Sequence, residues 1–143
     1  QKGTGDFLTI QEAINASPAF PYKRITIFIK DGIYKEKVKV HSWNPKITLL
    51  GESREGTIIT YDDYSGKANP NSNRNIGTSD SYTLLVRADD VRIENLTIEN
   101  TWCEKGQAVS LHIKGNRIII KNIYRGHGGK WIGCVAATHR CWA

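Results

Sequence analysis

The sequence predicts an all-β protein folded as a parallel β-helix, a solenoid with a short capping helix at its N-terminus. Three observations lead to this fold class. The apolar runs are short and β-branched, no helical pattern separates them, and a repeat of about 25 residues recurs with asparagine at the same place. Such a period fits one coil of three short strands, so each repeat would form one coil.

A short amphipathic helix is expected before the strands. Thr9 is followed three residues later by Glu12, the capping-box spacing in which the hydroxyl and the carboxylate each satisfy a backbone N–H group. Ile10 and Ile14 then fall on one helical face, and Pro18 ends the run. We expect this helix to cover the apolar end of the solenoid.

After the helix, the hydrophobic pattern becomes that of β-strands. Most runs have three to six residues and are bounded by Gly, Asn, Asp or Lys. The longest stretch alternates around Ile33, Val38 and Val40. The predicted strands are residues 25–29, 32–40, 47–50, 57–60, 83–86, 91–93, 96–98, 108–113 and 117–120.

The repeat is clearest where residues 91–97 align with residues 118–124 at an offset of 27. Asn95 would then lie beneath Asn122, and its side-chain amide would satisfy backbone groups of the turn as part of a ladder. A β-sandwich built from hairpins is the alternative. It is disfavoured because Asp31-Gly32 is the one Asp-Gly or Asn-Gly pair between strands, and it follows a fully apolar strand.

Residues 62–82 form a polar stretch that is too long for a turn within one coil. In a solenoid, such an insertion usually lies over one face, often the binding face. Tyr61, Tyr64 and Tyr82 flank it. Two uses of these tyrosines remain open, namely stacking on a sugar ring and anchoring the loop.

The charge of the chain is unevenly distributed. The 143 residues carry 20 Lys and Arg against 14 Asp and Glu, which gives a formal net charge of +6. Residues 105–143 hold seven of the basic side chains and no acidic one. This charge either covers a solvated surface or attracts an acidic polymer. We expect no nucleic acid and no membrane as partner, because the chain has no nucleic-acid-binding motif and no apolar run long enough to span a bilayer.

The cysteines give little guidance. Cys103, Cys134 and Cys141 are odd in number and form no CxxC pair, so no disulfide framework is predicted. The spacing of the last two with His127 and His139 matches no standard zinc finger, and we expect no metal site. No Gly-x-Ser-x-Gly turn, HExxH motif or phosphate-binding glycine loop is present either. By themselves, the residues predict a solenoid with a polar insertion, a shape that suits a long polymer.

Five segments carry a family resemblance: GDFLTIQEAI at 5–14, IFIKDGIYKEK at 27–37, ITLLGE at 47–52 with TIIT at 57–60, IENLTIENT at 93–101 and GQAVSL at 106–111. In this order they resemble the pectinesterases, the pectin methylesterases, which have a right-handed parallel β-helix fold. The resemblance extends from about residue 3 to residue 127. Each motif alone is weak, but the ordered set is specific.

The resemblance implies an aspartyl esterase that hydrolyses the methyl esters of pectin, a methylated galacturonan, to pectate and methanol in cell wall modification or pectin catabolism. One Asp would attack the ester carbonyl, a second would act as acid and then as base, two Gln side chains would stabilise the oxyanion, and an Arg would orient the nucleophile. It also implies a secreted protein, extracellular or periplasmic, with pectin as its partner and no cofactor.

Two residues match functional positions of the family. Gln107, in the QAV motif, matches the first oxyanion-stabilising Gln, and Thr78 matches a substrate-contacting Thr. The match then ends, because Gly128 and Gly129 stand where the family has its second Gln and its acid Asp.

Residues 127–143 hold two Cys, two Trp and two His without a strand pattern. The broken resemblance therefore implies an incomplete right-handed parallel β-helix, with a partial pectinesterase-like β-helix domain at 1–126 and a divergent tail at 127–143. No carboxylate follows Glu104, and the Asp pairs at 62–63 and 89–90 look like turn residues, so the two Asp roles are unfilled. We expect this chain alone to be inactive, and we hypothesise a truncated family member whose end is read out of frame.

Two alternative functions remain. A non-catalytic polysaccharide-binding β-helix would hold polyanionic pectin with its groove and its positive C-terminal surface. A pectate-lyase-like enzyme of the same architecture would need calcium, and the sequence has no acidic cluster suited to that ion. Methanol release, binding without turnover, and calcium-dependent formation of unsaturated sugar ends would distinguish the three functions.

Overall fold

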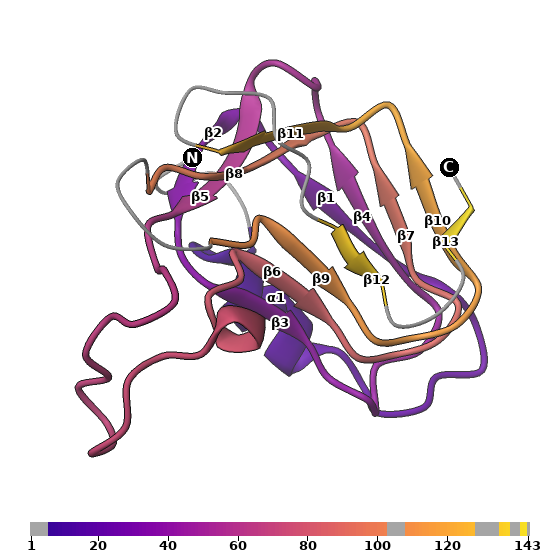
Figure 1. Cartoon of the computed structure of the whole chain (residues 1–143). Coiled ribbons are helices and arrows are strands. Elements are labelled where there is room, and N and C mark those ends of the chain that lie inside the picture. The colour runs from indigo at the N-terminus through magenta and orange to yellow at the C-terminus, as the bar shows by residue number, and fades with distance from the viewer. Residues whose placement is uncertain (1–5, 103–107, 128–134, 138–140, 143) are drawn as a thin grey trace.

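The computed structural model describes residues 6–102, 108–127, 135–137 and 141–142. The strands form three sheets, here named A, B and C, and every described strand pair is parallel. The chain passes through the three sheets in turn and returns to sheet A one coil further on (Figure 1). The predicted right-handed parallel β-helix is confirmed, and the hairpin alternative is wrong.

Each coil contributes one strand to each sheet. Sheet A contains β1 (Ile25–Ile29), β4 (Ile47–Gly51), β7 (Arg92–Glu94), β10 (Ile118–Lys121) and β13 (Cys141–Trp142). Sheet B contains β2 (Gly32–Lys35), β5 (Thr57–Tyr61), β8 (Thr97–Asn100) and β11 (Tyr124–His127). Sheet C contains β3 (Val38–Val40), β6 (Leu84–Val86), β9 (Leu111–Ile113) and β12 (Val135–Ala137). A 3-10 turn, η1 (Thr78–Asp80), precedes β6, and the helix α1 (Ile10–Ala16) precedes β1.

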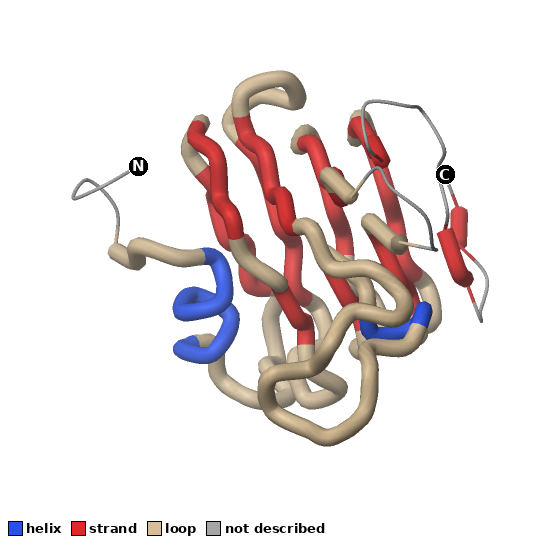
Figure 2. The backbone as a smooth tube through the Cα atoms, turned by 60° about the vertical axis from the view of Figure 1, so that its left-hand side comes forward, coloured by secondary structure: helices blue, strands red, loops and turns tan. Residues whose placement is uncertain are grey.

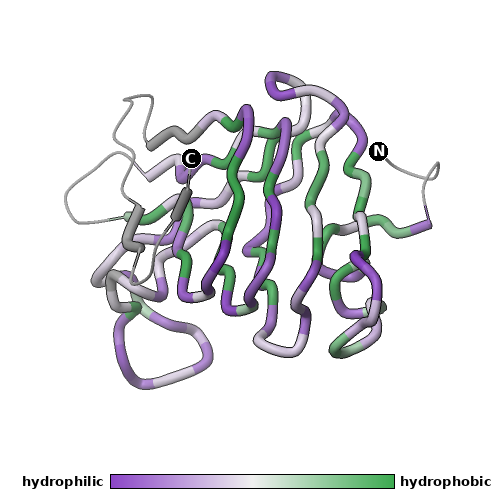
Figure 3. The backbone as a smooth tube through the Cα atoms, turned by 90° about the vertical axis from the view of Figure 1, so that its right-hand side faces the viewer, coloured by the Kyte–Doolittle hydropathy of each residue, from purple (hydrophilic) through white to green (hydrophobic). Residues whose placement is uncertain are grey.

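The core consists of side chains stacked from coil to coil. Strand pairing places Leu49 between Ile27 and Ile93 in sheet A, and it places Ile59 against Ile98 in sheet B. Leu49, Ile93, Ile59 and Ile98 are fully buried. Burying a side chain of this size stabilises the fold by about 1.5–3 kcal/mol. Figure 2 shows the stacked strands, and Figure 3 shows hydrophobic positions alternating with hydrophilic ones along them.

The N-terminal helix and its capping box are confirmed. The Thr9 hydroxyl accepts a hydrogen bond from the Glu12 backbone N–H at 3.1 Å, and the Glu12 carboxylate accepts one from the Thr9 N–H at 3.3 Å. Ile10 and Ile14 are buried in the same hydrophobic cluster as the strands. The helix contacts β1 and β3, so it covers part of the first coil.

Residues 32–40 were expected as one strand but form two strands on different sheets. The Glu36 N–H donates to the Thr60 carbonyl oxygen of the next coil at 3.1 Å, where the chain turns between β2 and β3. Ile33 lies on the outer side of β2 and is 75% exposed, whereas Val38 is fully buried. The correction reflects closure of the coil, because a chain that wraps around a core must change sheet where a flat strand would continue.

The predicted asparagine ladder is present. The Asn95 side-chain amide donates to the carbonyl oxygens of Gly51 at 3.1 Å and Glu52 at 3.3 Å, and the Asn122 amide donates to Asn95 Oδ1 at 2.6 Å. Asn95 and Asn122 have positive φ values of 58° and 49°, in a region that asparagine tolerates better than most residues. A Cβ on Gly51 would lie 2.1 Å from the Asn95 carbonyl oxygen, so the ladder also requires glycine there.

Residues 127–143, which were expected to lack a strand pattern, contribute β12 and β13. The first pairs with β9 in sheet C, and the second pairs with β10 in sheet A. These two strands were not predicted, because the backbone edge of a preceding coil can pair with a segment that shows no alternation of side chains. The division between 1–126 and 127–143 stays a prediction.

We predict that Asn95→Ala lowers the free energy of unfolding by about 1–2 kcal/mol more than Asn95→Gly does, because it removes the same two hydrogen bonds to the turn and the acceptor for Asn122 and also places alanine at a positive φ. Asn95→Gly retains the tolerance for positive φ and should cost about 1–2 kcal/mol. Urea denaturation followed by circular dichroism measures both. Asn71→Ala, in the exposed insertion, is the control and should stay within about 0.5 kcal/mol. An Asn95→Ala protein as stable as the parent would contradict the ladder.

Candidate functional site

The turns from sheet B to sheet C form one edge of the solenoid, here called the B–C edge. It comprises residues 36–37, 62–83 and 101–110 in successive coils, of which 103–107 lie outside the described residues. The long polar insertion extends from this edge between β5 and η1 (Figure 1), as predicted. Near its end, the Ser79 carbonyl oxygen lies 3.0 Å from Nδ1 of the buried His112. The insertion therefore covers part of the outer face of sheet C.

Asp63 is a buried charge at this edge. Its side chain is 7% exposed, and its carboxylate accepts hydrogen bonds from Lys37 Nζ at 2.7 Å and from Lys67 Nζ at 3.0 Å. Lys37 Nζ also donates to the Asp80 carbonyl oxygen at 2.6 Å and lies 4.4 Å from the centroid of the Tyr82 ring. Lys37 thereby ties both ends of the insertion to the turn between β2 and β3.

The two lysines keep the Asp63 carboxylate ionised. Burial by itself would raise the pKa of Asp63, but the hydrogen bonds and positive charges of Lys37 and Lys67 outweigh burial and hold the pKa below its ordinary value. The hydrogen bond to Asp63 in turn raises the pKa of Lys67. A carboxylate held by two ammonium groups is a structural anchor and a poor nucleophile or proton donor.

Asn100 joins three backbone segments at the B–C edge. It is fully buried, and its amide donates to the carbonyl oxygens of Asp63 at 2.8 Å, Ser81 at 3.1 Å and Val109 at 3.3 Å. Its Oδ1 accepts a hydrogen bond from the Trp102 N–H at 3.0 Å. One side chain therefore fixes the start and the end of the insertion relative to the segment that leads into β9.

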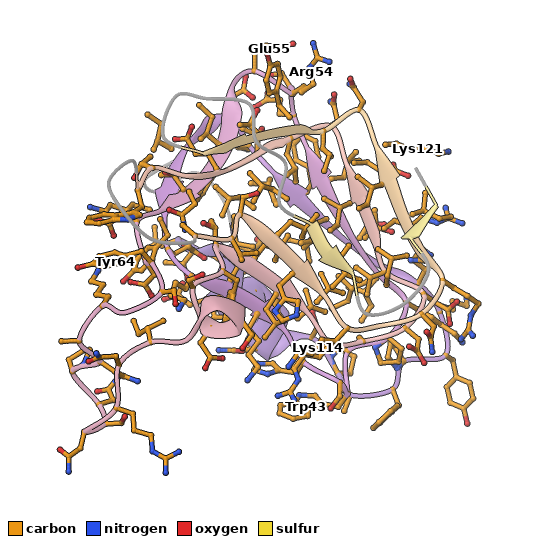
Figure 4. All side chains as sticks on the ribbon, viewed as in Figure 1. Trp43, Arg54, Glu55, Tyr64, Lys114 and Lys121 are labelled. Atoms are coloured by element: carbon orange, nitrogen blue, oxygen red, sulfur yellow. The ribbon has the colours of Figure 1, made fainter. Side chains whose placement is uncertain are left out.

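The tyrosines beside the insertion contact protein groups. The Tyr64 ring stacks on the Trp102 ring with centroids 3.6 Å apart and planes 10° apart, and Tyr82 lies under Lys37. Tyr64 lies where the insertion leaves the coil (Figure 4). These contacts favour loop anchoring for both residues over sugar stacking. Trp102 was missed by sequence reasoning, because one aromatic residue after a strand carries no specific signal.

Most of the sequence-predicted site falls outside the described residues. Gln107, Gly128 and Gly129 are among those that are not described, and Gln107 directly precedes Ala108, which is buried at the B–C edge. Thr78 begins η1, but its side chain is also outside the description. The roles assigned to Gln107 and Thr78 stay predictions.

The acidic pair at 89–90 lies at a different edge, where sheet C turns into sheet A. This C–A edge comprises residues 41–46, 87–91 and 114–117. The Asp90 carboxylate accepts hydrogen bonds from Arg117 Nε at 2.7 Å and Nη2 at 3.0 Å. This hydrogen bonding to Arg117 lowers the pKa of Asp90. Asp89 Oδ1 accepts from the Asn116 N–H at 2.8 Å. Within the described residues, no three His, Cys, Asp or Glu side chains gather as metal ligands.

A family model described as Pectinesterase matches residues 1–127. The chain belongs to the pectinesterase family. "Probable pectinesterase 56" of Arabidopsis thaliana is 36% identical to it over 119 residues, which are 82% of this chain and 39% of that protein. The predicted family is therefore confirmed.

Solved pectin methylesterases share the fold of this pectinesterase chain. The enzyme from carrot matches with a TM-score of 0.77 and 30% identity, over 85% of this chain and 36% of the carrot chain. A pectin methylesterase mutant in complex with a hexasaccharide matches with a TM-score of 0.76 and 28% identity, over 86% and 40% of the two chains. The chain thus spans about two fifths of the length of these relatives. None of its described helices has the length and apolarity needed to cross a bilayer.

We predict that Asp63→Asn lowers the free energy of unfolding at pH 7 by about 1–3 kcal/mol, because both lysines lose a charged partner. The folded pKa of Asp63 lies below the unfolded value of about 3.9. Its contribution is therefore complete above the unfolded pKa and is lost as the pH falls through the folded pKa. Urea denaturation at pH 7 and pH 3 should show a smaller acid-induced loss in the variant than in the parent.

Asp62→Asn is the matched control for this prediction. The Asp62 carboxylate is 45% exposed and lies 3.9 Å from Lys67 Nζ, so its loss should change stability by less than about 0.5 kcal/mol. An equal acid-induced loss in Asp63→Asn and the parent would show that Asp63 does not anchor the insertion.

Proposed function

We propose that this chain, or the protein that contains it, is a secreted pectinesterase, extracellular or periplasmic, which hydrolyses the methyl esters of pectin to pectate and methanol. The observation that carries the proposal is the family match over residues 1–127. The shared coil architecture with the carrot enzyme supports it. The hexasaccharide in a related pectin methylesterase structure supports an oligosaccharide as the ligand class.

In this proposal, Gln107 stabilises the oxyanion and Thr78 contacts the substrate. Thr78 lies at the end of the insertion, and Gln107 lies in the B–C turn of the next coil. A polymer that crosses the B–C edge would meet both turns. A fixed amide donor aimed at the developing negative charge of a tetrahedral intermediate is worth about 3–4 kcal/mol of the barrier.

The frame of this edge supports the proposed roles. The Asn100 amide donates hydrogen bonds to the carbonyl oxygens of Ser81 and Val109. Ser81 lies three positions after Thr78, and Val109 lies two positions after Gln107. A donor is effective only when its position is fixed before the reaction, because reorganisation during the reaction consumes the electrostatic gain. The buried Asn100 supplies such a fixed point for both turns.

The carboxylates of an aspartyl esterase have no evident source in these 143 residues. No Asp or Glu follows Glu104, and Asp63 is held by two lysines. We therefore propose that the 143-residue chain by itself binds methylated galacturonan without releasing methanol, and that turnover requires carboxylates supplied by further pectinesterase coils.

The proposal is tested with a hybrid in which residues 1–127 of this chain precede the remaining coils of the carrot enzyme. We expect methanol release from methyl-esterified pectin by the hybrid and none by the 143-residue chain. Gln107→Ala in the hybrid should lower kcat by about 10²–10³-fold, since one oxyanion donor is lost. Asn71→Ala, in the exposed part of the insertion, is the control and should leave kcat unchanged.

Three outcomes would contradict the proposal. If the hybrid is folded, as judged by circular dichroism, but releases no methanol, the result would favour a non-catalytic polysaccharide-binding β-helix. Calcium-dependent formation of unsaturated sugar ends would indicate a lyase. Full activity of the Gln107→Ala hybrid would show that Gln107 does not stabilise the oxyanion.

A further inference from the structure

Basic side chains form a row across the coils where sheet C ends. The Arg87 N–H donates to the Val40 carbonyl oxygen of β3 at 2.9 Å, and the Lys114 N–H donates to the Val86 carbonyl oxygen of β6 at 2.8 Å. In a parallel sheet, such bonds place equivalent residues of neighbouring strands side by side. His41, Arg87 and Lys114 therefore follow one another from coil to coil along the C–A edge.

Lys39 extends this row on β3, and we call Lys39, His41, Arg87 and Lys114 the basic row. Lys39 lies between two fully buried valines, so its side chain points outward from the sheet. Arg87 and Lys114 are exposed, and Lys39 and His41 are half-buried. Because neighbouring strands lie about 4.8 Å apart, the row spans roughly 10 Å across three coils.

The positive charge of the row is not neutralised by the ion pairs that the structure describes. These pairs do not include Lys39, Arg87 or Lys114. The acidic residues at 89–90 lie on the same edge, where Arg117 pairs with Asp90 at 2.7 Å and lies 4.0 Å from Asp89. One guanidinium offsets one of these two carboxylates, so the three cations Lys39, Arg87 and Lys114 outnumber the carboxylate that is left. An outward-facing row of unneutralised cations attracts a polyanion.

His41 connects the row to an aromatic surface. Its ring stacks on the Trp43 ring with centroids 4.4 Å apart and planes 5° apart, and Trp43 is 48% exposed. Figure 4 shows Trp43 and Lys114 along the same lower edge of the molecule. Burial lowers the pKa of His41, and the charges of Lys39 and Arg87 lower it further, as a local positive potential requires.

We propose that the basic row and Trp43 form a binding site for a de-esterified stretch of galacturonan, a chain of uronic acids that carries one carboxylate per sugar. The carboxylates pair with the cations of successive coils, and a sugar ring packs on Trp43. The choice of this polymer rests on the proposed function. This site is separate from the proposed site of Gln107 and Thr78 at the B–C edge, because the strands of sheet C run between that edge and the C–A edge.

The dimensions favour a single polysaccharide chain over a nucleic acid. The row is one residue wide, and α1 borders it on one side, where Gln11 bonds the Lys39 backbone and Asn15 Oδ1 lies 3.3 Å from His41 Nε2. A duplex presents two strands of phosphates and needs a broader basic surface. A narrow row beside one aromatic ring suits a single chain with regularly spaced carboxylates.

The test measures binding of the intact 143-residue chain to two oligogalacturonides of equal length by isothermal titration calorimetry. One is fully de-esterified and the other is fully methyl-esterified. Arg87→Glu with Lys114→Glu should weaken binding of the de-esterified oligomer by about tenfold or more at low salt, because two attractive charges become repulsive. Binding of the methyl-esterified oligomer should change by less than about twofold, because it carries no carboxylate charge.

Lys35→Glu with Lys121→Glu is the matched control. Lys35 and Lys121 are exposed on sheets B and A, and the double change alters the net charge by the same amount. It should weaken binding of the de-esterified oligomer by less than about twofold. Trp43→Ala should weaken binding of the de-esterified oligomer at high salt as well, since ring packing is not screened.

A second measurement does not depend on any variant. Bound de-esterified oligomer should protect Lys39 and Lys114 of the parent chain from acetylation and leave Lys35 and Lys121 reactive. The proposal is overturned if the control pair weakens binding as much as the row pair, if the row pair has no effect, or if single-stranded DNA binds as tightly with the same dependence on the row. These readouts need no turnover, so failure of methanol release would leave them unaffected.

Discussion

Parallel pairing of each strand with the strand one coil away is the interaction on which the rest of this molecule depends. It brings like positions into register, so Leu49 meets Ile93 in the core and Asn122 meets Asn95 at the turn. A core column and a side-chain amide ladder both require this register, because a shift by one residue would exchange the inner and outer faces. The same register aligns the outward side chains of the C–A edge.

The three corners of the coil use this register differently. The corner that contains Asn95 is tight, and its ladder leaves no room for a side chain on Gly51. The B–C edge accepts residues 62–83, because an insertion between paired strands leaves the pairing itself intact. Each doubling of loop length adds only about 0.6 kcal/mol of closure entropy. Asp63 and Asn100 then order the two ends of the insertion.

Charge pairing differs between the two edges of sheet C. At the B–C edge, Lys37 and Lys67 pair with the buried Asp63. At the C–A edge, Arg87 and Lys114 are exposed and outside the described ion pairs. The proposed polyanion site at the C–A edge rests on this difference.

Local signals predicted the elements of the fold well. The spacing of Thr9 and Glu12 predicted the helix start, the β-branched runs predicted most strands, and the repeat predicted that Asn122 lies on Asn95. Pattern failed at residues 32–40, where closure of the coil divides one alternating run between two sheets. It also failed at β12 and β13, which pair without a visible alternation.

The candidate site was only partly accessible to the same reasoning. The roles of Gln107 and Thr78 stay predictions, which were drawn from motifs that resemble those of the family. The partners Lys37 and Asp63 are 26 positions apart, and nothing in either segment indicates that they meet. Trp102 and Asn100 likewise gain their roles from segments that approach from elsewhere.

The sequence by itself determined the coil period, the capping helix, the ladder positions and the family, because each is encoded in residues close together or in a repeated order. Tertiary structure alone decided which charges are neutralised and which stay free. Asp63 meets Lys37 and Asp90 meets Arg117 because strand register brings distant turns to the same edge. Electrostatic pairing acts over a few ångströms in space, so it is set by the register of the folded coils and cannot be derived from separation along the chain.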